Sequence, residues 1–168
     1  MTVVVSDASP LNYLVWIGCE HVLPKLYERI LVPAVVLHEL EESGAPEKVA
    51  EWTTHLPEWI NVSTDHPDTK TADVYGLDGL DPGERHAILL AINEHADLLL
   101  MDERAAVRVA REHGLTVTGT LGILLQASER GLLDMDAALR DLQATAFRCT
   151  PALIEEIRRR AGNAGLSR

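Results

Sequence analysis

The sequence predicts an α/β fold, in which a parallel sheet of about five strands lies between two layers of helices. Two observations support this prediction. Short, almost wholly apolar runs at residues 3–5 and 98–101 are typical of strands that are buried on both faces of a parallel sheet. These runs alternate with longer segments whose apolar residues recur at helical spacing. Parallel strands joined through helices give right-handed crossovers, and hence a three-layer α/β/α architecture.

The first third of the chain follows this alternation. The strand at residues 3–5 ends at Ser6-Asp7, and a helix follows in which Ser9 is a favoured N-cap residue, Pro10 fits the first helical position and Gly18 ends the helix. We then expect a short helix over 21–28, a strand over 29–32, a helix over 34–42, a further helix to about residue 56 and an edge strand over 59–62.

The second part of the chain repeats the pattern after a loop. Residues 63–81 are rich in Asp, Thr, Pro and Gly and predict a surface loop with one helical turn. The expected elements that follow are a helix from Asp81 whose interior is largely buried, a strand over 98–101, a helix over 103–113, a strand over 115–117, a helix over 119–130, and two final helices over 134–147 and 150–160.

Composition limits the classes of function. Hydrophobic residues make up 46% and charged residues 24% of the chain, which is typical of a globular protein. No signal peptide or long apolar span is present and Cys19 and Cys149 show no ligand spacing, so we expect a cytoplasmic protein with reduced thiols and no membrane association. The net charge of −11 argues against a surface that binds nucleic acid non-specifically. It does not exclude a nuclease whose active site is built from carboxylates.

Four acidic residues are expected to converge at one edge of the sheet. Asp7 and Asp102 each directly follow an apolar strand, Glu39 lies in the helix after strand 29–32, and Glu84 lies in the first turn of the helix before strand 98–101. Two like charges about 4 Å apart repel by roughly 1 kcal/mol in water and roughly 4 kcal/mol at an effective dielectric near 20. A divalent cation relieves this repulsion, and Mg²⁺ and Mn²⁺ prefer oxygen ligands. The pattern therefore predicts a Mg²⁺ or Mn²⁺ site.

Alternatives remain open for all four acids. Asp7 could be a helix cap, although Ser9-Pro10 already supplies a good one. The spacing Asp81-x-x-Glu84 is a capping-box pattern, so a purely structural role for Glu84 is as well supported as ligation. Asp102 could cap the helix that starts after it. Glu42, three residues after Glu39, shares its helical face and could take its place.

Two accessory residues and one rival chemistry follow from the same positions. The Ser9 hydroxyl could contact a metal-bound water, and Arg104 could bind a phosphate, although an exposed helical arginine is the simpler interpretation. An acid after the first strand is also the phospho-acceptor position of haloacid-dehalogenase-like phosphatases and receiver domains. Those proteins use a lysine late in the chain, and none follows Lys70 here. Phosphoryl-acceptor chemistry at Asp7 is therefore disfavoured.

The order of the motifs resembles the PIN domain. The chain has Asp7-Ala8-Ser9 after the first strand, Val32-Pro33-Ala34-Val35-Val36-Leu37-His38-Glu39 after the second, Gly83-Glu84-Arg85-His86-Ala87-Ile88, and Leu98-Leu99-Leu100-Met101-Asp102-Glu103. It is similar in particular to the VapC-like ribonuclease toxin branch, whose members carry Gly-Thr-Leu-Gly-Ile-Leu after the last strand, here residues 119–124. The resemblance implies a single PIN-like domain over residues 1–168, with a core at about 3–133 and a C-terminal helical extension at 134–168.

The resemblance also implies a function. Members of this branch are Mg²⁺- or Mn²⁺-dependent endoribonucleases, often the toxin of a type II toxin–antitoxin pair and often homodimers, so we expect an RNA substrate and an antitoxin partner. By position, Asp7, Glu39, Glu84 and Asp102 match the family's catalytic, metal-binding acidic quartet, and Glu103 could add a second acid beside Asp102. The alternative is a catalytically inactive PIN-like module that binds protein.

Overall fold

Five parallel strands form the centre of the molecule and confirm the predicted α/β class. The structure, a computed structural model, describes residues 2–42, 44–64, 73 and 75–166. Most of the loop that the sequence predicts over 63–81 therefore lies outside the described residues. The strands are β1 (Val4–Ser6), β2 (Ile30–Pro33), β3 (Ile60–Ser63), β4 (Leu98–Leu100) and β5 (Val117–Thr118).

The helices in the described part of the chain connect these strands in the predicted alternation. None of them combines the length and the apolar character that a membrane-spanning helix requires. The helical elements are α1 (Ala8–Trp16), the 3₁₀ turn η1 (Glu20–Val22), α2 (Leu23–Tyr27), α3 (Ala34–Glu41), α4 (Glu47–Thr54), α6 (Pro82–Asn93), α7 (Arg104–Glu112), α8 (Thr120–Glu129), α9 (Met135–Gln143) and α10 (Pro151–Leu166).

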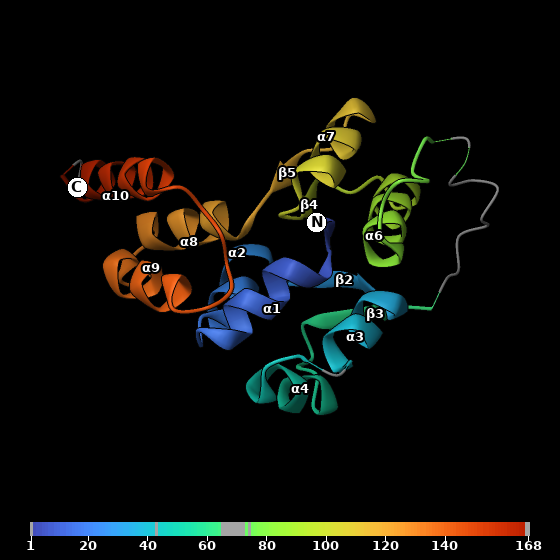
Figure 1. Cartoon of the computed structure of the whole chain (residues 1–168), viewed down its shortest axis with the longest axis horizontal. Helices are drawn as coiled ribbons and strands as arrows, with labels where there is room; N and C mark the ends of the chain where they lie inside the picture. The colour runs from blue at the N-terminus through green and yellow to red at the C-terminus, as the bar shows by residue number, and fades with distance from the viewer. Residues whose placement is uncertain (1, 43, 65–72, 74, 167–168) are drawn as a thin grey trace.

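Alternate residues of the central strands supply two hydrophobic cores, one on each face of the sheet. Val4 and Leu100 pack with α1, α2, α3 and α8 on one face, and Val5 and Leu99 pack with α6 and α7 on the other. Figure 1 shows α6 and α7 on the opposite side of the sheet from α1, α2 and α8. Because both faces of β1 and β4 are covered, their side chains are almost all apolar, as in other parallel sheets.

The strand order β3-β2-β1-β4-β5 places a topological switch between β1 and β4. From β1 the chain continues to β2 and β3 on one side, and it returns through α6 to β4 on the other side of β1. Ser6 lies beside Leu100 in the register, and the Asp7 amide donates to the Leu100 carbonyl oxygen at 2.9 Å. In open α/β sheets, ligands bind outside the carboxyl ends of the strands at such a switch. Asp7 and Asp102 follow the two strands that flank it.

Some boundaries differ from those that the sequence predicts. Helix α1 begins at Ala8, so Asp7 and not Ser9 holds the N-cap position, and Pro10 lies inside the first turn, where a missing N–H costs little. Helix α9 ends at Gln143 because the Thr145 hydroxyl donates to the Leu142 carbonyl oxygen and accepts from the Phe147 amide.

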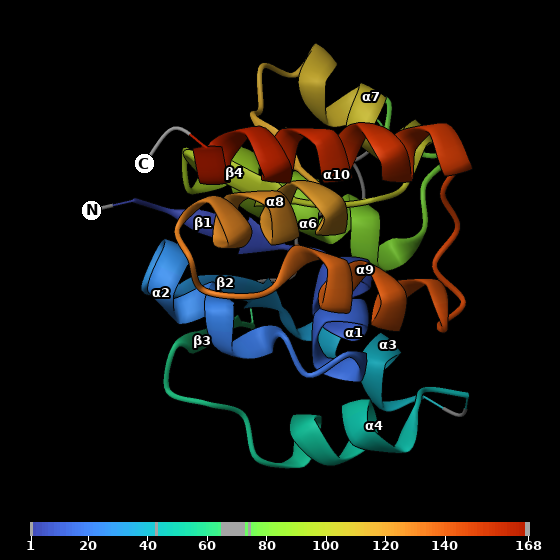
Figure 2. The same cartoon turned by 90° about the vertical axis from the view of Figure 1, so that its left-hand side faces the viewer.

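The C-terminal helices form a layer of their own on the α8 side of the sheet. Helix α10 continues to Leu166, beyond the expected end at residue 160. It packs on α8 and α9, as Figure 2 shows, with Ile154 and Ile157 buried in the core of that face. The buried residues of these helices therefore extend the core on that face of the sheet.

Candidate active site

Asp7 is a buried carboxylate at the carboxyl end of the central strand. It occupies the N-cap position of α1, but its side chain makes no capping hydrogen bond, and only 4% of the residue is exposed. Its Oδ1 atom is buried without a hydrogen-bond partner. The pKa of Asp7 is raised to about 7: burial is the main cause, the Ala8 amide opposes the rise, and the negative charges of Glu39, Glu84 and Asp102 add to it. A buried oxygen without a partner is costly, and its place in the site points to a ligand.

Asp102 is held by the first residue of α8. Its Oδ1 accepts from the Thr120 amide at 2.7 Å and its Oδ2 accepts from the Thr120 hydroxyl at 2.6 Å. Burial raises the pKa of Asp102, and the two Thr120 hydrogen bonds oppose that rise. The N-cap of α7 is Glu103, whose side chain lies 3.5 Å from the Ala105 amide nitrogen. Asp102 therefore does not cap α7.

Glu39 reaches from α3 to the start of α6. Its Oε1 accepts from the Gly83 amide at 2.9 Å, across 44 positions in the chain. A Cβ atom on Gly83 would lie 2.5 Å from Glu39 Oε2, so a larger residue there would push this carboxylate out of its present position. Burial raises the pKa of Glu39, the Gly83 amide opposes the rise, and the charges of Asp81 and Glu42 add to it. Glu39, rather than the exposed Glu42, therefore lies toward Asp7 and the end of β1.

Glu84 closes a helix cap and also lies near the other carboxylates. Its Oε2 accepts from the Asp81 amide at 3.0 Å, which is half of a capping box. Its pKa is raised by burial and, after the opposing Asp81 amide bond, by the charges of Asp81, Glu103 and Glu39. Because Glu84 also raises the pKa of Asp7, a carboxylate that closes the cap lies within electrostatic reach of the site.

Helix N-termini offset the repulsion within this cluster of like charges. Asp7 stands at the N-terminus of α1, Glu39 and Glu84 accept from backbone amides at the start of α6, and Asp102 accepts from the first amide of α8. A negative charge at a helix N-terminus is stabilised by roughly 0.3–1 kcal/mol at exposed positions. Three helices thus converge on the four carboxylates. The helix dipoles lower the pKa of each acid and so partly oppose the rise that burial and mutual repulsion cause.

Two surface hollows border the acidic cluster. One, of about 510 Å³, is lined by residues of α1 and α3 that include Ser9, Asn12, Tyr13, Glu39 and Glu42. The other, of about 490 Å³, is lined by Asp102 and one face of α7, beginning with Arg104. The accessory residues that the sequence suggests therefore lie around the cluster: Ser9 and Glu42 on one side, Arg104 on the other, and Glu103 at the start of α7.

The donor set of the cluster fits a hard divalent cation. All four candidate ligands are carboxylates, one of which has a buried oxygen without a partner. In the side-chain positions described, no three His, Cys, Asp or Glu residues are arranged to hold a single ion. Glu39, Glu84 and Asp102 instead accept from protein donors, although each carboxylate can accept further bonds. The residue types thus suit Mg²⁺ or Mn²⁺, and binding would draw the carboxylates together.

Thr120 and Gly83 hold the site together but are not apparent as site residues from spacing alone. Each acts on a carboxylate far away in the chain, Asp102 in one case and Glu39 in the other. Gly119 belongs with them, because a Cβ there would lie 2.7 Å from Asp102 Oδ1. The signal in the sequence is the pair of short motifs Gly83-Glu84 and Gly119-Thr120, in which a glycine precedes a residue of the site.

Comparison with known families gives one clear finding. A family model described as the PIN domain matches residues 3–163, which includes all five strands, both hydrophobic cores and most of α10. A comparison with curated proteins finds no match.

Proposed function

Because the chain belongs to the PIN domain family, whose members are generally nucleases, we propose that it is a Mg²⁺- or Mn²⁺-dependent endoribonuclease that hydrolyses RNA phosphodiesters. One observation carries the proposal most directly. Four carboxylates from four separate segments surround the carboxyl ends of β1 and β4, and one of them, Asp7, is buried with a raised pKa and an unpaired oxygen. Such groups cluster at functional sites.

In this proposal Asp7, Glu39, Glu84 and Asp102 hold the cation. A bound divalent cation supplies an activated water and a counter-charge for the phosphate. Thr120 orients Asp102 through two hydrogen bonds, and the Gly83 amide orients Glu39. During hydrolysis a water oxygen bonds to phosphorus while the bond to the departing 3′ oxygen breaks, so no side-chain nucleophile is needed.

The finer proposal is that the protein acts in the cytoplasm as the toxin of a type II toxin–antitoxin pair, as a homodimer that an antitoxin inhibits. Its support is the resemblance of residues 119–124 to the Gly-Thr-Leu-Gly-Ile-Leu motif of VapC-like toxins. Thr120, in the middle of that motif, bonds to Asp102. Induced expression should arrest growth, the Asp7→Asn variant should not, and arrest by both proteins would contradict the toxin assignment.

A protein-binding module with a dead site is not favoured. Such a module has no need for acids at all four positions, and all four are present. The burial of Asp7 with an unpaired oxygen destabilises the fold, a cost for which a non-catalytic module offers no compensation.

The decisive experiment is a cleavage assay on single-stranded RNA with Mg²⁺ or Mn²⁺, run beside two variants. Asp7→Asn should abolish cleavage while preserving the fold by circular dichroism. Glu58→Gln is the matched control, because Glu58 is an exposed acid just before β3, at the opposite edge of the sheet. It should cleave as the parent does. Equal cleavage by the parent and Asp7→Asn would overturn the proposal.

A further inference from the structure

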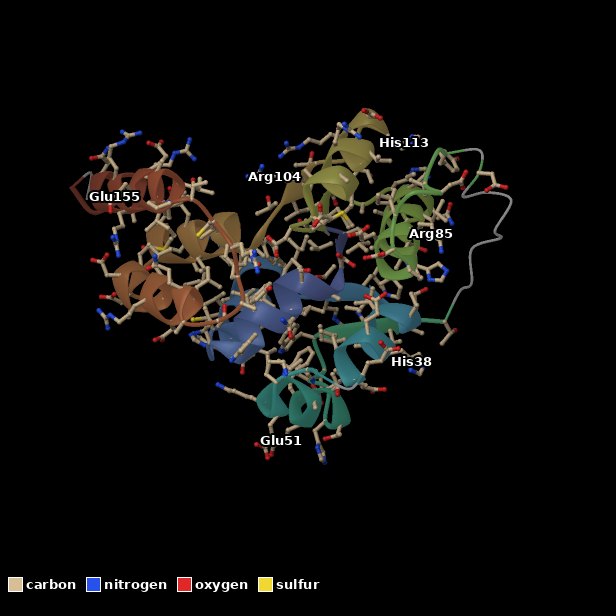
Figure 3. The ribbon with its side chains drawn as sticks, viewed as in Figure 1. His38, Glu51, Arg85, Arg104, His113 and Glu155 are labelled. Carbon is tan, nitrogen blue, oxygen red and sulfur yellow. The ribbon has the colours of Figure 1, made fainter. Side chains whose placement is uncertain are left out.

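A row of arginines begins beside Asp102 and follows α7 away from the carboxyl ends of the strands. The hollow of about 490 Å³ is lined by Asp102, Arg104, Val107, Arg108, Arg111 and Glu112. Figure 3 labels Arg104, at the end of α7 nearest the sheet, and His113, just past its far end. The hollow therefore leads from a carboxylate of the candidate active site along the exposed side of one helix.

The spacing of these arginines puts them on one face. Arg104, Arg108 and Arg111 stand at i, i+4 and i+7, and all three are exposed. The opposite face is apolar and small, with Ala106 and Ala110 fully buried against the core that α6 shares. At a rise of about 1.5 Å per residue, the row spans about 10 Å.

The charge of this face differs from that of the chain as a whole. The protein carries a net charge of −11, whereas α7 has three arginines and one acid, Glu112. That acid lies 3.9 Å from Arg108, but both side chains are well exposed, at 65% and 75%, so their attraction is weak and readily exchanged. The arginines are thus available to another anion.

We infer that this face of α7 binds consecutive phosphates of the RNA strand that passes through the acidic cluster, with Arg104, Arg108 and Arg111 as its contacts. The inference rests on the proposed nuclease function and names the path of its substrate. Guanidinium groups bind phosphate oxygens in bidentate geometry. A row of about 10 Å spans about three steps between neighbouring phosphates, and hence about four phosphates, at the axial spacing of about 3.4 Å in a stacked strand. The acidic cluster repels RNA when no cation is bound. The arginine row beside it supplies positive charge in a protein whose net charge is −11.

The test measures RNA binding rather than cleavage. In the Asp7→Asn background, which prevents turnover, a short fluorescein-labelled oligouridylate is titrated at several salt concentrations and followed by anisotropy. The added pair Arg108→Gln and Arg111→Gln should weaken binding about tenfold at physiological salt and reduce the salt slope by about 1.4, since each phosphate contact on a single strand contributes about 0.7.

Two further proteins make the result specific. The pair Arg29→Gln and Arg140→Gln removes the same charge from exposed arginines outside the hollow, one just before β2 and one on α9, and should leave the affinity within twofold of the reference. The pair Arg108→Lys and Arg111→Lys should restore the salt slope. Unchanged binding by the α7 glutamine pair, or an equal loss in the control pair, would overturn the inference.

The outcomes separate this inference from the proposed function. If the parent protein cleaves RNA and the variant with both α7 glutamines binds RNA normally, the nuclease proposal holds and the inference about α7 is wrong. If α7 is required for binding but no cleavage occurs with Mg²⁺ or Mn²⁺, the path stands and the nuclease proposal fails. If the parent does not bind RNA at all, the path is overturned.

Discussion

At the scale of single residues, Asp7 shows the cost of the site most directly. Its carboxylate is buried, one of its oxygens has no hydrogen-bond partner, and three other acids lie within electrostatic reach. In the unfolded chain the pKa of the same group lies near its ordinary value of 3.8, whereas in the fold its pKa is about 7. The fold therefore holds a proton that the unfolded chain has already lost, over the whole interval between these two values.

The sign of the resulting pH dependence is fixed. Between about pH 4 and pH 7 the folded state binds more protons than the unfolded state, so the free energy of unfolding falls as pH rises. We predict that Asp7→Asn stabilises the metal-free protein near pH 8 by up to about 4 kcal/mol and flattens this decline, because a shift of about three units is worth about 4 kcal/mol. Urea unfolding of the parent and of Asp7→Asn, with a chelator present, measures the free energy of unfolding at about pH 5 and pH 8. Parallel curves for the two proteins would contradict it.

Two substitutions of Glu84 can separate its capping role from its proposed role in cleavage. We predict that Glu84→Gln loses cleavage but keeps its stability, because the amide oxygen can still accept from the Asp81 amide. Glu84→Ala should lose cleavage and also about 1 kcal/mol of stability, the usual cost of losing a helix cap. Thermal unfolding and RNA cleavage are measured on both variants. Full activity in the glutamine variant would mean that Glu84 serves only as a cap.

At the scale of elements, the site depends on the close approach of α3 to the start of α6. A Cβ on Gly83 would meet the Glu39 carboxylate at 2.5 Å. We predict that Gly83→Ala displaces Glu39 and reduces cleavage at least tenfold with little loss of stability, because the end of the Glu39 side chain can move and alanine favours a helix. The matched control is Gly162→Ala on α10, where a Cβ has open space and alanine should stabilise the helix by up to about 1 kcal/mol. Equal behaviour of the two variants would contradict the steric argument.

The same elements show which parts of the site the sequence can predict. Asp7 and Asp102 follow recognisable buried strands, so their place at one edge follows from the parallel fold itself. The choice between Glu39 and Glu42 does not follow from the helical spacing. Helix α3 ends at Glu41, so Glu42 lies outside it, and Glu39 contacts the Gly83 amide 44 positions away. Thr120 is also missed, because its contact with Asp102 depends on the tertiary fold: Thr120 begins α8, whereas Asp102 follows β4.

At the scale of the whole molecule, strand order converts distant segments into one site. Strands β2 and β3 lie on one side of β1, and β4 and β5 lie on the other side. The acids that follow β1 and β4 therefore lie near acids from α3 and α6. The chain as a whole is negatively charged, whereas α7, which borders the site, carries three arginines. The carboxylates suit a cation, and α7 presents the opposite charge on the adjoining hollow.

If the cluster binds a divalent cation as proposed, we predict that binding is linked to the proton on Asp7. A carboxylate ligates only after it loses its proton, and the pKa of Asp7 is about 7. The ionised fraction rises from about one tenth near pH 6 to about nine tenths near pH 8, so the apparent affinity for Mn²⁺ should rise about tenfold over this interval. Because a ligand that binds only the folded state stabilises it, the Mn²⁺-induced rise in melting temperature should also be larger near pH 8.

Calorimetry tests this linkage directly. Titrating Mn²⁺ near pH 7 in two buffers of different ionisation enthalpy should report release of about half a proton per ion bound, because Asp7 is about half protonated there. Glu58→Gln should release the same amount, since this exposed acid lies at the far edge of the sheet. In Asp7→Asn the release should vanish along with most of the affinity. Tight binding that is independent of pH, in either the parent or this variant, would show that the cation binds away from Asp7.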